Sequence, residues 1–227
     1  MSRCDAIVIG AGVIGSSVAL ELSRGGRSVV VVDKGPGAGA GSTSASSAII
    51  RYSYSTRDPI LTAWEAAQMW FDWEAHLGVV DPDGMARLIG CDNLILRTTG
   101  YDGAAMIPFW DEFEIPYDLL DATQLAERVP ALDIGKYVPP KRIDDPAFAA
   151  DAVGELTAIL SRSCGFIDDP MLSAKNLAFA ARYHGAEFRF RSQVVSVDRS
   201  AGAVNGITLA SGESIEAPVV VNVAGPH

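Results

Sequence analysis

The sequence has 227 residues, of which 18 are Lys or Arg and 28 are Asp or Glu, so its formal net charge is −10. This length allows one large domain or two smaller ones, and the negative charge argues against nucleic acid or an anionic membrane surface as a partner. Three scattered cysteines and three histidines without ligand spacing indicate neither a disulfide framework nor a metal site.

The N-terminal segment predicts no secretion signal, because its short apolar run reaches glycines at once. No apolar stretch is long enough to cross a bilayer as a helix. We therefore expect a cytoplasmic protein without a membrane span.

Residues 5–33 follow the pattern of a dinucleotide-binding βαβ unit. A β-branched run at residues 6–9 predicts a buried parallel strand, and it leads directly into the glycine turn Gly10-Ala11-Gly12-Val13-Ile14-Gly15. Apolar residues at helical spacing follow the turn, and residues 28–32 form a second apolar strand. Asp33 closes this strand about 20 residues after the turn, where an acid can accept hydrogen bonds from a ribose.

The glycines of the turn each have a physical role toward a dinucleotide. Gly10 permits the tight turn, Gly12 lets the backbone approach a pyrophosphate, and Gly15 lets the helix pack closely on the strand. The N–H groups at the start of the helix, at Val13 and Ile14, face the phosphates. The fingerprint predicts a nucleotide site, but it does not separate NAD from FAD.

Residues 37–55 read GAGAGSTSASSAIIRYSYS and have two interpretations. Such Gly/Ser composition is typical of a flexible linker. The segment nevertheless joins a nucleotide-binding strand to an apolar helix and carries isoleucines and tyrosines, so we interpret it as a cofactor loop. Its small residues can bring backbone N–H groups and hydroxyls close to a phosphate or a flavin. The residues that can do so are Gly39, Gly41, Ser42, Thr43, Ser44, Ser46 and Ser47.

Arg51 is a single cation at the point where the small residues stop. Its planar guanidinium suits a carboxylate, which it can bind with two parallel hydrogen bonds. A solvated surface charge or a structural ion pair is the alternative interpretation, because most arginines are exposed.

The rest of the chain carries shorter signals. Asp58-Pro59 predicts the cap and first residue of a helix that ends at Gly78, with an apolar stripe typical of a core helix. Two short strands at residues 87–89 and 93–96 predict a hairpin. Further helices are predicted near 103–113, at 122–128 behind Asp121, and after Asp169-Pro170, and further strands at 187–190, 194–197, 204–209, 214–216 and 219–223.

The glycine turn, Asp33-Lys34, the string GSTSASSAIIR at residues 41–51 and the end of the chain resemble the FAD-dependent D-amino acid oxidase superfamily. Its sarcosine oxidase and dimethylglycine dehydrogenase branch is the most similar. The resemblance implies FAD as the cofactor, with Asp33 and Lys34 in its site, and Arg51 as the ligand of a substrate carboxylate. It also implies that Val194 contacts the adenine and that Ala224-Gly225 lies close to the cofactor.

The fold that this resemblance implies is α/β, with a Rossmann-like FAD-binding domain and an inserted, incomplete α+β substrate domain. We expect residues 1–85 and 151–227 to form the two parts of the FAD-binding domain, and residues 86–150 to form part of the substrate domain. Because family members continue for a comparable length after Gly225, we expect the sequence to be truncated. The C-terminal half of the family fold, or a partner subunit, would then complete the protein.

Three functions follow from these observations. The first is an FAD-dependent oxidase or dehydrogenase that oxidises the C–N bond of a small amino acid or N-methyl amine. Its implied mechanism is hydride transfer from the substrate to flavin, which leaves an imine. The second is a non-catalytic FAD-binding fragment or subunit that needs a partner. The third is an NAD-dependent dehydrogenase, in which further strand and helix units would normally follow Asp33.

Overall fold

The computed structural model describes residues 2–98, 100 and 102–226, which divide into two compact units. The first unit contains residues 1–48, 69–88 and 167–227, and the second contains residues 49–68 and 89–166. The sequence analysis instead expected residues 49–68 and 151–166 in the FAD-binding parts and residues 86–88 in the substrate domain. The first two of these segments belong to the second unit because they bury side chains such as Ile60 and Ile159 in its core.

A four-stranded parallel sheet forms the centre of the first unit. Its strand order is β10-β3-β2-β14, and its members are β2 (Ala6–Ile9), β3 (Val29–Val32), β10 (Glu187–Arg189) and β14 (Val219–Asn222). Each neighbouring pair is parallel, as the predicted βαβ unit requires. Because β2 and β3 are covered on both faces, they are almost continuously apolar.

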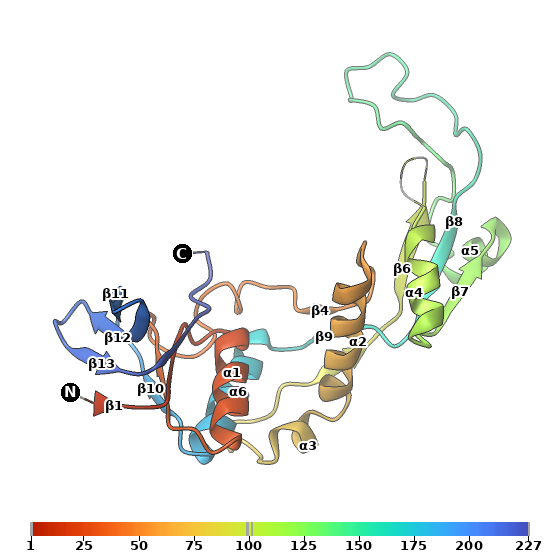
Figure 1. Cartoon of the computed structure of the whole chain (residues 1–227). Helices are drawn as coiled ribbons and strands as arrows, with labels where there is room; N and C mark the ends of the chain where they lie inside the picture. Colours follow the sequence, from red (N-terminus) through yellow and green to blue (C-terminus); the bar gives the residue numbers. More distant parts are fainter. Residues whose placement is uncertain (1, 99, 101, 227) are drawn as a thin grey trace. The chain divides into compact units, whose positions relative to one another are not determined.

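Alternate side chains of these strands enter two different cores. Val8 and Val31 face α1 (Val13–Arg24) and α6 (Pro170–Tyr183), which lie side by side in Figure 1. Ile7 and Val30 point the other way and contribute to a core shared with a second sheet. That sheet has the order β1-β13-β12-β11, with β1 (Ser2–Arg3), β11 (Val194–Ser200), β12 (Ala203–Leu209) and β13 (Ser214–Glu216). The first unit therefore has three layers: helices, a parallel sheet and a mostly antiparallel sheet.

Buried Asn176, on α6, fixes the connection that follows α3 (Trp73–Leu77). Its amide nitrogen donates to Asp81 Oδ2 at 3.0 Å and to the carbonyl of Gly84 at 2.8 Å. Its amide oxygen accepts from the backbone N–H of Ala86 at 2.9 Å and from the Trp73 indole at 3.4 Å. One side chain thus satisfies donors and acceptors from α3 and from the connection that follows it.

The second unit is built on the antiparallel sheet β6-β8-β7, with β6 (Asn93–Arg97), β7 (Tyr117–Leu120) and β8 (Thr157–Ser161). Its main core contains Tyr52, Trp110 and Ile159, all fully buried. The Trp110 indole donates to the carbonyl of Tyr52 at 3.1 Å. The helical elements here are α2 (Arg57–Phe71, which continues into the first unit), η1 (Ala104–Met106), α4 (Ile107–Glu112) and α5 (Ala122–Arg128).

A short three-stranded sheet has the order β4-β9-β5, with β4 (Ile49–Ile50), β9 (Gly165–Ile167) and β5 (Leu88–Gly90). Ile49 pairs with Phe166 and Ile50 with Gly165 in antiparallel register. Position 51 therefore follows directly on a strand that is held by its neighbour.

The structure corrects three details of the sequence analysis. The predicted hairpin at residues 87–96 is wrong, because β5 and β6 belong to different sheets and pair with distant strands. The helix expected from Asp58 begins at Arg57 and is interrupted by Asp72, which caps the separate helix α3. The strand expected at residues 219–223 ends at Asn222, and it lies at the end of its sheet with Val219 48% exposed.

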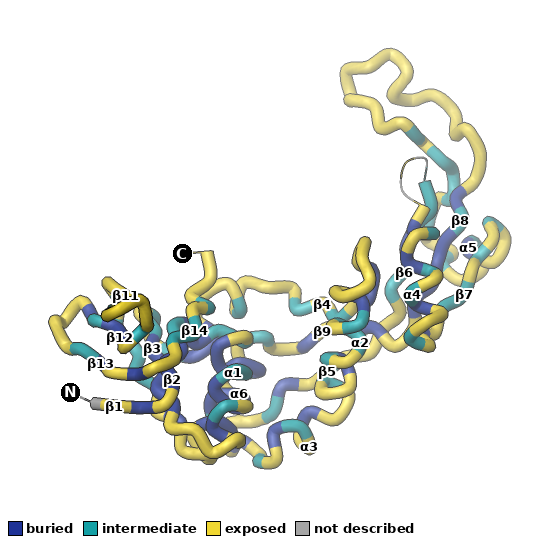
Figure 2. The backbone as a smooth tube through the Cα atoms, in the orientation of Figure 1, coloured by how far each residue is buried: buried dark blue, intermediate teal, exposed yellow. Residues whose placement is uncertain are grey.

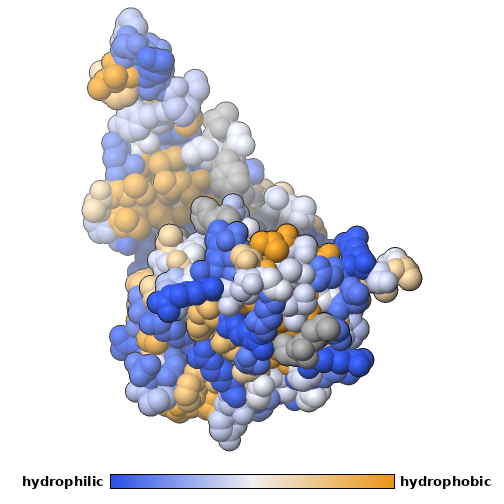
Figure 3. Space-filling model, turned by 90° about the vertical axis from the view of Figure 1, so that its left-hand side faces the viewer, coloured by the Kyte–Doolittle hydropathy of each residue, from blue (hydrophilic) through white to orange (hydrophobic). Residues whose placement is uncertain are grey.

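Residues 129–156 form a long connection between α5 and β8, and Figure 2 shows most of it as exposed. Apolar side chains such as Ile143 and Val153 are largely exposed in this connection. Hydrophobic residues also gather over part of the second unit in Figure 3, whereas the face of the first unit seen there carries both hydrophilic and hydrophobic residues. Among the described helices, none has the length and hydropathy of a membrane span.

Candidate functional site

The glycine turn between β2 and α1 is packed so closely that two of its positions cannot carry a side chain. A Cβ at Gly15 would overlap the carbonyl oxygen of Gly10. A Cβ at Gly10 would meet the carbonyl oxygen of Val223 at 2.5 Å, and the φ angle of Gly10 is +106°. The turn therefore brings β2, α1 and the segment after β14 into direct contact.

Gly12 has a different role, because its missing side chain leaves space at the start of α1. An added Cβ there would contact only the hydroxyl oxygen of Thr43, at 3.1 Å. As the N-cap of α1, Gly12 supplies no side-chain acceptor, and the N–H of Val13 donates to Thr43 Oγ1 at 3.1 Å. Ile14 is 64% exposed beside it. The start of α1 thus presents N–H groups and a hydroxyl, which suit a phosphate.

Asp33 joins the end of β3 to the glycine turn. Its Oδ2 accepts from the backbone N–H of Ala11 at 2.7 Å, and its Oδ1 accepts from the N–H of Gly35 at 2.6 Å. Asp33 is half-buried, whereas Lys34 is exposed. Each carboxylate oxygen keeps a second lone pair, so the acid can still accept from a ribose hydroxyl.

The segment predicted as a cofactor loop is a series of turns, with no helix or strand before β4. Gly39 is buried and its N–H donates to the carbonyl of Ala11 at 2.9 Å, which ties the loop to the glycine turn. Hydrogen bonds within the loop follow, from the Ser44 N–H to the carbonyl of Gly39 and from the Ser46 N–H to the carbonyl of Thr43. These bonds are not those of a flexible linker. Among the predicted residues of this loop, those exposed to solvent are Gly41, Ser42, Ser44, Ser46 and Ser47.

The remaining predicted cofactor residues lie in the same unit. Ala224 contacts the turn, since its Cα is 2.9 Å from a Cβ built on Gly10. Gly225 follows it and is exposed. Val194 begins β11, two residues after Ser192, whose N–H donates to the carbonyl of Asp33 at 2.8 Å. The structure therefore gathers segments from both ends of the chain around the turn.

Arg51 belongs to the second unit and is exposed. Its guanidinium donates to the carbonyl of Ser53 at 2.9 Å and to Ser53 Oγ at 2.8 Å, and it lies 5.2 Å from the ring centre of Tyr54. Neither contact is an ion pair, so the positive charge of Arg51 is not neutralised by these partners. Burial raises the pKa of the neighbouring Tyr52 phenol, which donates to the carbonyl of Ser163 at 2.7 Å.

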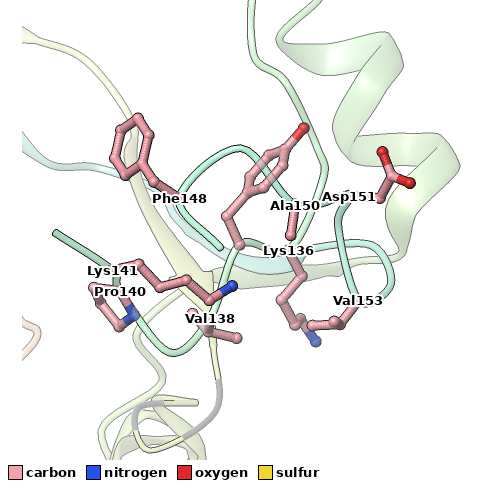
Figure 4. Close-up of a pocket in the computed structure, with 9 residues that line it drawn as sticks. Lys136, Val138, Pro140, Lys141, Phe148, Ala150, Asp151 and Val153 are labelled. Carbon is pink, nitrogen blue, oxygen red and sulfur yellow. The ribbon is translucent and has the colours of Figure 1, made fainter. Parts of the chain in front are cut away.

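Two of the cavities lined by described residues lie in the second unit. One of about 670 Å³ shares Ser53 and Tyr54 with the surroundings of Arg51. Its other described lining residues are Ser55, Thr98, Gly100, Asp102, Gly103, Ala105 and Met106. The other cavity, of about 340 Å³, lies in the connection before β8, and Figure 4 shows Lys136, Lys141 and Asp151 around it. No predicted site residue lines this second cavity.

A comparison with known families identifies the chain. The model of the DAO family, described as FAD dependent oxidoreductase, matches residues 5–227. The chain belongs to this family. Its members are FAD-dependent oxidoreductases, as the resemblance of the glycine turn and the serine-rich loop had indicated. Among curated proteins, the FAD-dependent oxidoreductase domain-containing protein 1 of Xenopus laevis is 36% identical over 86 residues, which are 36% of this chain and 17% of that protein.

Solved structures of DAO-like enzymes share the fold. L-proline dehydrogenase from P. horikoshii matches with a TM-score of 0.76 and 20% identity, over 98% of this chain and 53% of that chain. Glycine oxidase from Geobacillus kaustophilus matches with a TM-score of 0.73 and 21% identity, over 99% of this chain and 56% of that chain. The chain thus spans about half the length of these structures, and they establish the α/β fold expected from the sequence.

The residues around the glycine turn fit the dinucleotide part of FAD. The space above Gly12, the hydroxyl of Thr43 and the carboxylate of Asp33 offer a phosphate cradle and a ribose acceptor within one unit. Sequence reasoning missed Ala11 and Gly35, which orient Asp33 through their backbone N–H groups. Only the glycine at position 35 could have signalled this, because a Cβ there would meet Asp33 Oδ1 at 3.0 Å.

Proposed function

We propose that this chain binds FAD and forms part of an oxidoreductase that oxidises the C–N bond of a small amino acid or N-methyl amine to an imine. The observation that carries the proposal is the cradle at Gly12, Thr43 and Asp33, in a chain that matches an FAD-dependent family over residues 5–227. Because the chain spans about half of the solved relatives, the activity is proposed for the protein that contains this sequence.

The chain's own residues would bind and orient both molecules. The N–H groups at the start of α1 would hold the pyrophosphate, with Gly41, Ser42, Ser44, Ser46 and Ser47 around it. Asp33 and Lys34 would bind near the ribose, Val194 would meet the adenine through its backbone, and Ala224-Gly225 would approach the cofactor from β14. FAD, when bound, would accept the two electrons that the substrate loses as its C–N bond becomes C=N.

Arg51 is proposed as the ligand of the substrate carboxylate. Its guanidinium is exposed, is oriented by Ser53 and stands beside a cavity that is large enough for a small amino acid. A carboxylate held by two parallel hydrogen bonds would fix the direction of the substrate's C–H bond, which favours the reaction by positioning. The sarcosine oxidase-like branch of the family and a cytoplasmic location remain predictions of the sequence.

The first experiment is an absorbance spectrum of the purified protein, followed by chromatography of the cofactor that acid releases. We expect FAD, and we expect small amino acids or N-methyl amines to bleach the flavin band under anaerobic conditions. Arg51→Ala should retain FAD and lose most of this bleaching, whereas Arg142→Ala, at an arginine that is 87% exposed and paired with Asp144, should behave as the wild type.

Two results would support other functions. FAD that is bound but never bleached by such amines would favour a non-catalytic FAD-binding subunit that needs a partner. Release of NAD without flavin would favour an NAD-dependent dehydrogenase. Equal bleaching rates in Arg51→Ala and the wild type would remove Arg51 from the substrate site.

A further inference from the structure

Cys91 and Cys164, both in the second unit, lie opposite each other at the ends of neighbouring strands. Cys91 follows β5, Cys164 precedes β9, and the N–H of Cys91 donates to the carbonyl of Cys164 at 3.0 Å. At the other end of this strand pair, the N–H of Asp168 donates to the carbonyl of Arg87 at 3.0 Å. Both bonds fit one antiparallel register, so the two cysteines are directly opposed and their side chains leave the same face.

This arrangement has nearly the dimensions of a disulfide. Directly opposed residues of a hydrogen-bonded antiparallel pair have Cα atoms about 5.5 Å apart, and disulfides span about 4.4–6.8 Å between Cα atoms. The Cβ atoms of such a pair are about 4.5–5.5 Å apart, against about 3.8 Å in a disulfide. A bond between the two cysteines therefore needs only a small approach of the strand ends.

The two thiols have different surroundings. Cys91 is exposed, whereas Cys164 is 3% exposed and belongs to the core around Tyr52 and Trp110. The Cys164 sulfur lies 3.4 Å from Ser161 Oγ. All three cysteines of the chain are free, and Cys4 is buried in the other unit. An exposed thiol that can react first is thus paired with a protected thiol that can resolve it.

We propose that Cys91 and Cys164 are a modification site at which a hydroperoxide forms a reversible disulfide. The Cys91 thiolate attacks the O–O bond of hydrogen peroxide, so that an S–O bond forms, the O–O bond breaks and one water leaves. The Cys164 thiol then attacks the Cys91 sulfur, an S–S bond forms, the S–O bond breaks and a second water leaves. The two thiols lose two electrons and two protons, and the peroxide is reduced to two waters.

The disulfide would act on the segment that carries Arg51. Gly165, next to Cys164, pairs with Ile50, and the carbonyl of Ser163 accepts from the Tyr52 phenol. If the start of β9 shifts toward Cys91, the contacts that hold residues 50–52 in place change with it. The consequence for substrate binding rests on the proposed function of Arg51, but formation of the bond does not.

Formation of the bond is tested on the full chain by thiol alkylation and mass spectrometry. The protein is treated with hydrogen peroxide, denatured, alkylated with N-ethylmaleimide and mapped by peptide. We expect Cys91 and Cys164 to escape alkylation together, while Cys4 is alkylated. The two cysteines should appear in one linked peptide, whose mass is that of the two reduced peptides less two hydrogen atoms. Dithiothreitol should restore all three thiols.

Matched variants separate this pair from other oxidation. Cys4→Ser should still form the bond, whereas Cys91→Ser should keep both remaining thiols alkylatable. Cys91 oxidised to sulfinic acid beside a free Cys164, or a disulfide that contains Cys4, would overturn the proposal. Because the peptide map is made on the wild type, this result does not depend on how a variant folds.

The effect on Arg51 has its own readout. Amine-dependent flavin bleaching is compared before and after peroxide in Cys4→Ser, and we expect a slower rate that dithiothreitol restores. If no amine bleaches the flavin in either state, the proposed function fails while the mapped disulfide still stands. An unchanged bleaching rate in fully disulfide-bonded protein would overturn the link to Arg51.

Discussion

The carboxylate of Asp33 accepts a hydrogen bond from the backbone N–H of Ala11 at 2.7 Å. The acid at the end of β3 and the glycine turn after β2 are therefore linked before any ribose is involved. A side chain at position 33 has two tasks, since it holds the turn and is proposed to bind the cofactor.

Replacing Asp33 tests both tasks. We expect Asp33→Ala to weaken FAD binding by about 10–100-fold, because a hydrogen bond to a charged group contributes about 1.5–3 kcal/mol. Asp33→Asn keeps one acceptor oxygen, so its affinity for FAD should lie between those of Asp33→Ala and the wild type. Titration of the apoprotein with FAD measures the effect, with Asp144→Ala as a control on an exposed carboxylate of the other unit. Unchanged affinity in Asp33→Ala would contradict the cofactor role.

Substitution of Gly15 tests the close packing of the turn, and the same substitution at Gly41 is its control. Gly15→Ala places a Cβ on the carbonyl oxygen of Gly10, so we expect a loss of at least about 2 kcal/mol in the free energy of unfolding. Gly41→Ala meets nothing within 4 Å and should change that free energy by less than about 0.5 kcal/mol. Urea unfolding followed by fluorescence measures both, and equal midpoints would contradict the close packing.

Asn176 is expected to be important for stability and not for chemistry. Asn176→Ala leaves the N–H of Ala86, the carbonyl of Gly84 and the Trp73 indole without their partner, which should cost about 2–4 kcal/mol. Asn205→Ala, at an exposed position of β12, should cost less than about 0.5 kcal/mol. Thermal unfolding compares the two variants, and a similar melting temperature for both would show that the network is not needed.

Asp168 should stabilise the folded protein at neutral pH and lose this effect in acid. Hydrogen bonds from the backbone N–H and the side chain of Arg87 lower the pKa of Asp168, although burial opposes them. The folded pKa lies below the unfolded value of about 3.9. Ionised Asp168 therefore adds to the free energy of unfolding above that pH, and this contribution is lost as the pH falls through the lower folded pKa. The contribution should not exceed about 1 kcal/mol, because the ion pair is at the surface.

The measurement is urea unfolding of the wild type and Asp168→Asn at pH 7 and at successively lower pH. The difference between the two proteins should be largest at neutral pH and should shrink as Asp168 is protonated in the wild type. A difference that grows toward acid pH would contradict the direction of this pKa shift.

Local signals explain what the sequence predicted well. The strand at residues 6–9 and the helix behind Asp121 were found because an apolar run and a capping residue act on their own neighbours. In the structure, Gln124 completes that cap as a capping box, with bonds of 2.8 and 3.0 Å between the two residues. The place of Asp33 after β3 was predicted for the same reason, since its spacing from the turn is fixed by one βαβ unit, whereas its role toward a cofactor stays a prediction.

Long-range pairing explains what the sequence did not predict. The strands at 88–90 and 93–97 are close in sequence, and a hairpin was the natural expectation, yet β6 pairs with β8 and β5 with β9. Nothing in the short turn Cys91-Asp92 encodes those distant partners. The backbone donor Ala11 could not be predicted either, because a backbone N–H leaves no residue type as a signal. The role of Arg51 depends on a substrate and stays a prediction.

The parallel pairing of β14 with β2, in which Val219 lies opposite Ala6, also has a consequence for biosynthesis. A ribosome makes the glycine turn about 210 residues before the backbone of Val223 and Ala224, which closes over Gly10. Until those residues emerge, the nascent chain exposes the edge of an apolar strand. We therefore expect cofactor capture to be a late event in synthesis, and the unfinished chain to depend on chaperones for solubility.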